Sequence, residues 1–197
     1  MAEMWRLFIA IEIPAHVLDQ LGVLQDHLKK KSPARTVRWA QPAGIHLTLK
    51  FLGDVPVIKR DTLQKALTKA VADHAPFTLI ATELGCFPNV QRPRVIWVGV
   101  RQNQAALVAL REAVEDHIAP LGYPTEQRTF SPHLTLGRVQ RDAQRGDIQR
   151  LGDLIANTTY AERHSWPVNE VHLIRSELKP TGAEYTILFR ALLQTGE

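Results

Sequence analysis

The tetrapeptide His-Leu-Thr-Leu occurs twice in this chain, at His46–Leu49 and again at His133–Leu136. In an extended strand, successive side chains point to opposite faces. The two leucines of each copy then share one face and can anchor a core, while the histidine and the threonine share the other face. The repeat therefore predicts two strands, each presenting an imidazole beside a hydroxyl.

Length and composition are those of an ordinary globular protein. With 197 residues, of which 45% are hydrophobic, the chain can form one large domain or two small lobes. The formal net charge of +4 favours polyanionic partners without requiring them. The single cysteine, Cys86, excludes a disulfide framework and a thiolate zinc cluster, so a reducing cytoplasm fits best. No run of about 18 apolar residues occurs, so we expect no membrane span.

Hydrophobic periodicity and turn signals predict alternating strands and helices. The predicted helices span 14–30, 57–72, 105–118 and 148–155. Besides the strand of the second motif at 133–136, the predicted strands span 6–13, 37–39, 45–51, 77–84, 95–100, 171–178 and 184–193, with a loop at 85–94 and a tight turn at 179–182. These elements predict an α+β fold.

The elements that follow each His-Leu-Thr-Leu copy come in the same order. We interpret this as an internal repeat, roughly 37–100 and 124–193, within a single domain over 1–197. The alternative is the strand and helix alternation that any α+β domain shows. A pseudo-twofold relation between the repeats would bring the two motif strands face to face across a cleft.

Two histidines in one cleft suit acid and base catalysis at phosphorus. Histidine is the side chain whose unperturbed pKa lies near neutrality, so one ring can accept a proton while the other donates one. Thr48 and Thr135 could donate hydrogen bonds to the phosphate oxygens or fix the imidazoles. For either threonine alone, ordinary β-propensity is an equally good explanation.

The chain resembles the two-histidine phosphoesterases, and within them the bacterial RNA 2′,3′-cyclic phosphodiesterases, also called 2′-5′ RNA ligases. Five segments carry the resemblance, and together they extend over nearly the whole chain. They are Arg6-Leu-Phe-Ile-Ala-Ile-Glu-Ile-Pro14, His46-Leu-Thr-Leu-Lys-Phe-Leu-Gly53, Phe87-Pro-Asn with Arg92-Pro-Arg94, Pro132-His-Leu-Thr-Leu-Gly-Arg138, and Ser176-Glu-Leu-Lys-Pro-Thr-Gly-Ala-Glu-Tyr185.

The resemblance implies a bilobal fold with two pseudo-symmetric lobes, each an antiparallel sheet with helices outside, and an active-site cleft between them. It implies hydrolysis of 2′,3′-cyclic phosphate ends of RNA to 2′-phosphomonoesters, with reversible 2′-5′ ligation as a side capacity. By carry-over, His46 is the proton donor and His133 the proton acceptor. The resemblance implies no metal and no nucleotide cofactor, and no obligate protein partner is evident.

Several further residues are candidates for binding phosphate or RNA, and each also has a simple structural explanation. Arg138 could neutralise the phosphate, or it could be a solvated arginine at a strand end. Arg92 and Arg94 could follow an RNA backbone, although a solubilising loop charge explains either one. Phe51 and Phe87 could stack on a terminal base, but Phe51 is more simply a core residue.

Three other functions stay open. A metallohydrolase could use His46 and His133 as ligands, but neither motif has the spacing or the acidic neighbours of a metal site. The basic charge also allows a noncatalytic RNA-binding module. A cyclic phosphodiesterase acting on small nucleotides would use the same chemistry, and the shape of the pocket would distinguish it.

Overall fold

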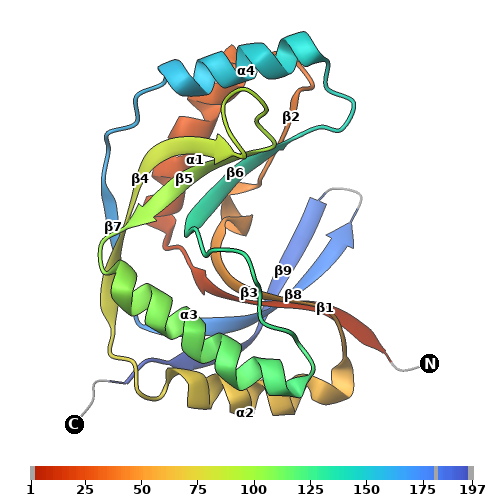
Figure 1. Cartoon of the computed structure of the whole chain (residues 1–197), viewed down its shortest axis with the longest axis vertical. Helices are drawn as coiled ribbons and strands as arrows, with labels where there is room; N and C mark the ends of the chain where they lie inside the picture. Colours follow the sequence, from red (N-terminus) through yellow and green to blue (C-terminus); the bar gives the residue numbers. More distant parts are fainter. Residues whose placement is uncertain (1–2, 180–181, 195–197) are drawn as a thin grey trace.

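Two antiparallel sheets organise the chain into two lobes, as Figure 1 shows. The computed structural model describes residues 3–179 and 182–194. The first sheet has the order β3-β1-β8-β9, with β1 (Met4–Glu12), β3 (His46–Pro56), β8 (Glu170–Lys179) and β9 (Gly182–Leu192). The second has the order β2-β6-β5-β4-β7, with β2 (Val37–Trp39), β4 (Phe77–Phe87), β5 (Val95–Arg101), β6 (His133–Val139) and β7 (His164–Val168). The expected bilobal α+β fold is confirmed.

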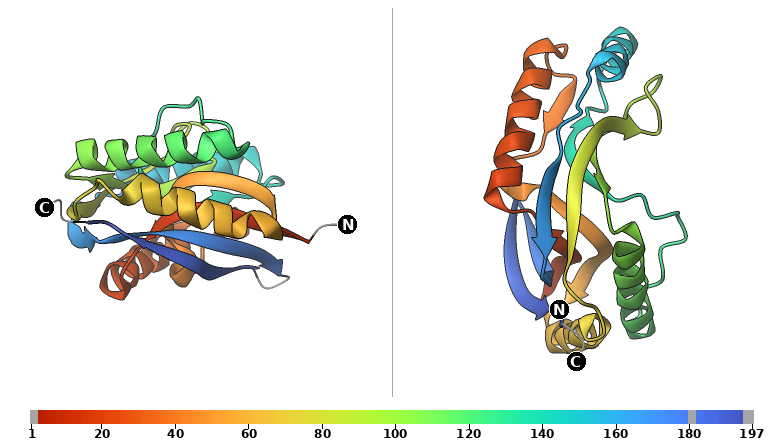
Figure 2. Two further views of the ribbon diagram at one scale, coloured as in Figure 1. Left: turned by 90° about the horizontal axis from the view of Figure 1, so that it is seen from below. Right: turned by 90° about the vertical axis from the view of Figure 1, so that its left-hand side faces the viewer.

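Each lobe has its own pair of helices. In the first lobe, α2 (Arg60–Val71) and α3 (Gln104–Ile118) pack against each other and contact β9 and β3, respectively. In the second, α1 (Ala15–Lys31) contacts β7, and α4 (Arg145–Asn157) contacts β4. Figure 2 shows these helices on the outside of the molecule. No helix of the described residues has the length and hydrophobicity to cross a membrane.

Short 3₁₀ turns join several elements. They are η1 (Pro42–Gly44), η2 (Val57–Lys59) and η3 (Ala119–Leu121). The predicted helix at 57–72 is therefore a 3₁₀ turn followed by α2. The predicted loop at 85–94 begins later than expected, because β4 continues to Phe87. Of the predicted turn at 179–182, residues 180 and 181 lie outside the described residues.

Strand β7 was not predicted from the sequence. It has five residues, including Pro167, and lies at the edge of the second sheet. An edge strand tolerates proline because one side of its backbone needs no ladder hydrogen bond. A proline in so short a segment removes the usual strand signal, which explains the omission.

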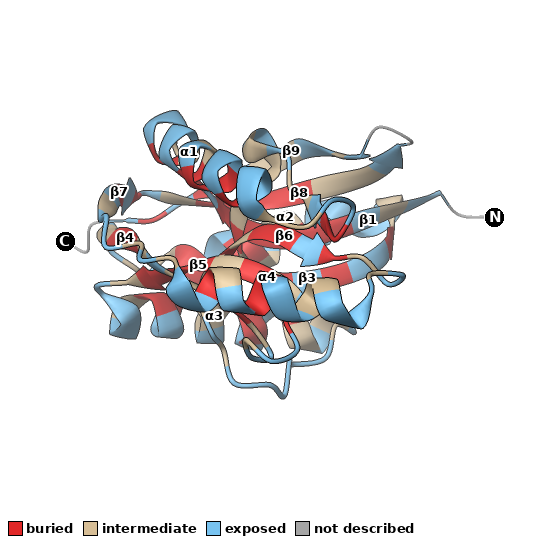
Figure 3. Cartoon of the chain, turned by 90° about the horizontal axis from the view of Figure 1, so that it is seen from above, coloured by how far each residue is buried: buried red, intermediate tan, exposed pale blue. Residues whose placement is uncertain are grey.

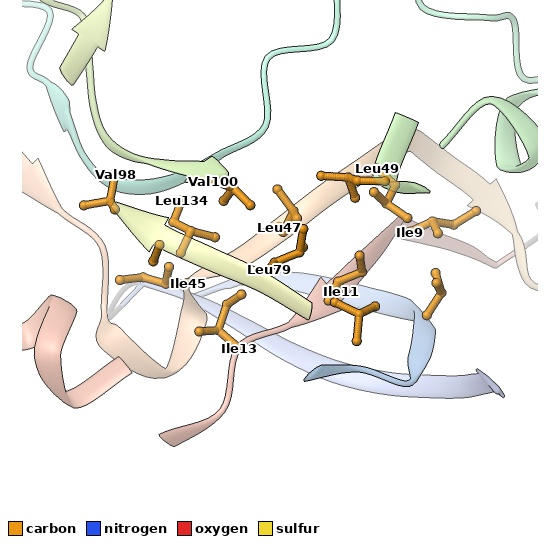
Figure 4. Close-up of a cluster of buried hydrophobic side chains, with 14 of the residues drawn as sticks. Ile9, Ile11, Ile13, Ile45, Leu47, Leu49, Leu79, Val98, Val100 and Leu134 are labelled. Atoms are coloured by element: carbon orange, nitrogen blue, oxygen red, sulfur yellow. The ribbon is translucent and has the colours of Figure 1, made fainter. Parts of the chain in front are cut away.

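The leucines of both motifs lie in one hydrophobic core. Leu47, Leu49, Leu134 and Leu136 are at most 4% exposed and belong to a single cluster. Figure 4 shows Leu47 and Leu134 in the same group of side chains, although they come from different sheets. In Figure 3 the buried residues follow the strands and the inward sides of the helices. The predicted anchoring role of these leucines is confirmed.

Strands from distant parts of the chain mix in each sheet. The first sheet contains β1, β3, β8 and β9, and the second contains β2, β4, β5, β6 and β7. The motif strand β3 lies beside β1 in the first sheet, and the motif strand β6 lies beside β5 in the second. By position in the sheet, β5 therefore corresponds to β1, and β4 corresponds to β8. The internal repeat stays a prediction. Neither of its proposed units corresponds to one sheet.

Candidate active site

The two motif strands have the same local structure. From the histidine onward, β3 and β6 share one succession of half-buried, buried and exposed residues over seven positions. Each strand also has a register shift at the second leucine of its motif. In β3 the pairing passes from Thr48 to Lys50, and in β6 from Thr135 to Gly137.

This bulge decides which side chains accompany the histidines. Because one residue is skipped, Lys50 and Gly137 lie on the buried side with the leucines. The next residues, Phe51 and Arg138, then return to the exposed side, on the face of the histidine and the threonine. The sequence pattern alone predicts strict alternation, which would place Phe51 and Arg138 differently.

His46 lies between two aromatic rings from other strands. The Phe8 ring is stacked on the imidazole with centroids 4.5 Å apart, and Tyr185 meets it edge-on at 5.2 Å. Burial lowers the pKa of His46 from 6.5 to about 4, and a hydrogen bond with the backbone of Gly44 offsets part of that effect. The imidazole is therefore neutral at pH 7 in the ligand-free protein.

His133 has a similar environment in the second sheet. Its Nδ1 donates a hydrogen bond of 2.7 Å to the carbonyl oxygen of Ser131, and Phe87 meets the ring edge-on at 4.9 Å. Burial lowers the pKa of His133. The bond to Ser131 opposes this effect, and the charge of Arg138 adds to it.

The hydrogen bond to Ser131 fixes the tautomer of the neutral ring. A carbonyl oxygen only accepts, so Nδ1 of His133 carries the proton and Nε2 keeps its lone pair. In both motifs the backbone of the residue two positions before the histidine, Gly44 or Ser131, opposes the effect of burial on its pKa.

The two threonines lie on the histidine face of their strands and are half-buried. Within the described ranges, neither the Thr48 nor the Thr135 hydroxyl has a hydrogen-bond partner, whereas the hydroxyls of Thr68 and Thr158 bond to carbonyls of their helices. Both motif hydroxyls therefore have their hydrogen-bonding capacity available for a ligand.

The residues predicted to support the histidines differ in their surroundings. Arg138 is exposed on the face of His133, and its charge acts on that ring. Phe87 touches His133 and lies 5.0 Å from Trp97. The interpretation of Phe51 as a core residue was wrong, because it is 67% exposed as a consequence of the bulge.

Arg92 and Arg94 are exposed at the end of the loop that enters β5. The backbone of Arg92 donates to Asn89, and that of Arg94 pairs with Phe87 and Val139. These are backbone contacts and do not involve the guanidinium groups. The roles of Arg92 and Arg94 as RNA contacts stay predictions.

Sequence reasoning missed several neighbours of the histidines. Phe8 and Tyr185 flank His46, and Trp97 lies across from Thr135. Phe8 belongs to the apolar strand predicted at 6–13 and is itself buried. Only strand register brings these residues to the site, so spacing along the chain carries no signal for them.

A pocket of about 230 Å³ opens beside His46. His46, Tyr185, Ile174 and Glu12 line it together with residues of α1 and η1. Among the residues that the structure describes, no group of three or more His, Cys, Asp or Glu side chains could hold a metal ion.

Comparison with known proteins identifies the family. The model of the 2′-5′ RNA ligase superfamily matches residues 18–180, most of the chain. The chain belongs to the 2′-5′ RNA ligase superfamily. Two relatives are each named RNA 2′,3′-cyclic phosphodiesterase. The Methanothermobacter thermautotrophicus protein is 34% identical over 92% of this chain and 95% of its own length, and the Aquifex aeolicus protein is 31% identical over 85% and 88%.

Solved structures of this superfamily share the fold. The chain matches Escherichia coli LigT complexed with 3′-AMP with a TM-score of 0.77 and 28% identity, covering 98% of this chain and all of the other. It matches TT0787 of Thermus thermophilus with a TM-score of 0.74 and 29% identity, covering 95% and 97%. The whole bilobal architecture is therefore that of the superfamily.

Proposed function

We propose that this protein hydrolyses 2′,3′-cyclic phosphate ends of RNA to 2′-phosphomonoesters with His46 and His133 as acid and base and without a metal. Family membership supports the reaction class, and several relatives carry the name RNA 2′,3′-cyclic phosphodiesterase. The formal charge of +4 suits a polyanionic substrate.

The main support for a base is the hydrogen bond from His133 to Ser131. It keeps the proton on Nδ1 and leaves Nε2 as the free lone pair that can accept a proton from water. The lowered pKa keeps His133 in this neutral form at pH 7. We therefore assign His133 as the proton acceptor.

In the proposed reaction, water attacks phosphorus as Nε2 of His133 takes its proton. The bond from phosphorus to the 3′ oxygen breaks, and His46 protonates that leaving oxygen, so the phosphate remains on the 2′ oxygen. His46 must be protonated for this step. The negative charge of the bound cyclic phosphate favours the imidazolium form and supplies the required rise in the pKa of His46.

Thr48 and Thr135 would stabilise the charge that develops on the non-bridging oxygens. Their hydroxyls have no partner among the described residues and share the faces of the histidines. Arg138, whose charge already acts on His133, would add a planar guanidinium for phosphate. Phe51, exposed on the His46 side, is a surface on which a terminal base could stack.

A metallohydrolase is the less favoured function of the same residues. Aromatic rings of Phe8, Tyr185 and Phe87 pack against the two histidines, and the one carboxylate that lines the His46 pocket, Glu12, belongs to no group of three or more metal-ligating side chains among the described residues. Aromatic rings offer no ligand atoms like the carboxylates and imidazoles of metal sites. The buried, unpaired thiol of Cys86 also suits a reducing cytoplasm, where we place the protein.

The decisive experiment uses an RNA oligonucleotide ending in a 2′,3′-cyclic phosphate, with EDTA present. We expect complete conversion to a 2′-phosphate. His46→Ala and His133→Ala should each lower kcat by about 10²- to 10⁴-fold while RNA affinity is retained. A 3′-phosphate product, or activity that requires an added divalent ion, would contradict the proposal. Strong binding without turnover by the wild type would instead establish an RNA-binding module.

A further inference from the structure

Two arginines stand directly opposite each other beside the candidate active site. Arg38 of β2 pairs with Arg138 of β6, between the pairs Val37 with Val139 and Trp39 with Gly137. Side chains opposite each other in an antiparallel pair project from the same face of the sheet. Both arginines are exposed.

That face is the one that carries His133. Val37 and Val139, one position away from the arginines, are only 9% exposed and belong to the core. By alternation, Arg38 and Arg138 project away from the core, as His133 does. The charge of Arg138 acts on His133, and Arg38 lies opposite Arg138 on the neighbouring strand.

The pair is unfavourable in the ligand-free protein. Like charges directly opposite each other in a sheet are destabilising. Within the described residues, neither guanidinium has a carboxylate within 4.0 Å, whereas Arg101 and Arg175 on other strands pair with Glu83 and Glu177. An anion bound between Arg38 and Arg138 would relieve their repulsion.

Strand β2 is held firmly despite having three residues. The N–H of Ala40 donates to the carbonyl of Leu136 at 2.8 Å, and that of Gln140 donates to Thr36 at 2.9 Å. The buried Gln25 side chain donates to Leu136 and Ala40 at 2.7 and 3.0 Å. The backbone that carries Arg38 is therefore positioned before any ligand binds.

Gly137 is required for this arrangement. A Cβ at this position would lie 2.7 Å from Cγ1 of Val37 and 3.1 Å from Cε3 of Trp39. The absence of a side chain lets β2 pack closely over the bulge of β6. Lys50 and Gly137 occupy equivalent positions after the bulges of β3 and β6. In β3 this position holds a buried lysine, whereas in β6 the glycine leaves room for the neighbouring strand β2, which carries Arg38.

We propose that Arg38 binds a second phosphate, the internucleotide phosphodiester that precedes the terminal cyclic phosphate, and that Arg138 lies between the two phosphates. Guanidinium groups match phosphate geometry well, and Arg38 lies one strand spacing, about 4.8 Å, further out than Arg138. This inference rests on the proposed function and specifies its substrate. The enzyme would act on RNA ends in preference to free 2′,3′-cyclic mononucleotides, which have no second phosphate.

The test compares two substrates with Arg38→Ala. For an oligonucleotide ending in a 2′,3′-cyclic phosphate, we expect KM to rise about tenfold with kcat unchanged. The slope of log KM against the logarithm of the salt concentration should decrease by about 0.7, the contribution of one phosphate contact on single-stranded nucleic acid. For a 2′,3′-cyclic mononucleotide, KM should stay at the wild-type value. For the oligonucleotide, the KM of Arg38→Lys should lie between those of the wild type and Arg38→Ala, because lysine keeps the charge but not the bidentate geometry.

Arg163→Ala is the matched control. It removes the same charge from an exposed position just before β7, at the opposite edge of the same sheet. Both substrates should behave as with the wild type. An Arg38→Ala enzyme whose KM is unchanged for the oligonucleotide, or raised equally for both substrates, would overturn the proposal.

Binding separates this proposal from the proposed function. Fluorescence anisotropy with an oligonucleotide that ends in a 2′-phosphate requires no turnover. Weaker binding by Arg38→Ala but not by Arg163→Ala would support the second-phosphate site even in an inactive protein. Equal binding by both variants would reject the site, and a failure of wild-type turnover alone would reject the hydrolytic function.

Discussion

The ring of Phe8 lies 4.5 Å from the imidazole of His46, with an angle of 30° between the ring planes. Phe8 is itself 3% exposed, so it shields one side of the imidazole from water. The contact exists because β1 pairs with β3, although the two residues are 38 positions apart in the sequence. It links the packing of the first sheet to the protonation of His46.

This contact predicts an unusually low pKa for His46. In a ¹⁵N NMR titration of the ligand-free protein, His46 should titrate with a pKa of about 4, because burial disfavours the imidazolium. Inorganic phosphate should raise that pKa by stabilising the charged ring. Phe8→Leu should also raise it, since a smaller side chain admits water. Titration of His46 near 6.5 in the wild type would show that burial does not control it.

The same shift predicts how stability depends on pH. The unfolded chain binds a proton at His46 below pH 6.5, but the folded protein does so only near pH 4. The free energy of unfolding should therefore fall as the pH drops from 6.5 to 4, by at most about 3 kcal/mol from this group. Chemical denaturation of the wild type and of His46→Gln at several pH values measures it. The variant should lose less stability over this interval, and equal losses would refute the assignment.

The hydroxyls of the motif threonines should matter for turnover. Thr48→Val and Thr135→Val keep the shape of the side chain but remove the donor. Each should lower kcat by about 10²-fold with little change in KM, as expected for a donor that acts in the transition state. Thr68→Val on the exposed side of α2 is the control and should be active. Full activity of both motif variants would assign their threonines to β-propensity alone.

A buried ion cluster connects the first motif strand to α3. Lys50, placed in the core by the bulge, pairs with Glu115 and donates to the carbonyl of Pro124 at 2.9 Å, while Arg111 donates to Glu115 at 2.9 Å. Lys50 and Glu115 are almost fully buried.

Glu115→Gln should therefore be strongly destabilising. The substitution leaves two cations without a counter-charge and should cost about 3–5 kcal/mol in the free energy of unfolding, measured with urea. Glu112→Gln on the exposed side of the same helix should change it by less than about 0.5 kcal/mol. A small effect of Glu115→Gln would mean that the cluster is well hydrated.

Gly85 should control the position of His133 from a distance. A Cβ at Gly85 would overlap the ring of Trp97, which lies 5.0 Å from Phe87, the ring that touches His133. Gly85→Ala should therefore lower kcat by about tenfold or more, because a misplaced catalytic group is costly. Gly22→Ala has nothing within 4 Å of the new methyl group and should be fully active. Equal activities would show that Trp97 moves without disturbing His133.

The sequence was sufficient for features that depend on local periodicity. Alternation placed Leu47 and Leu134 in the core and their histidines on the other face, because a strand repeats every two residues wherever it lies. The doubled motif and the family resemblance predicted the bilobal α+β fold. Chemistry suggested phosphate as the ligand, since two imidazoles can supply an acid and a base.

Tertiary structure decided what local periodicity does not encode. The bulge in β3 moved Phe51 to the surface and Lys50 into the core, reversing the interpretation of Phe51. Strand order brought Phe8 and Tyr185 to His46 and set Arg38 opposite Arg138. Pairing between strands is fixed by packing over the whole chain, so residues distant in sequence become neighbours only when the two sheets have formed around their common core.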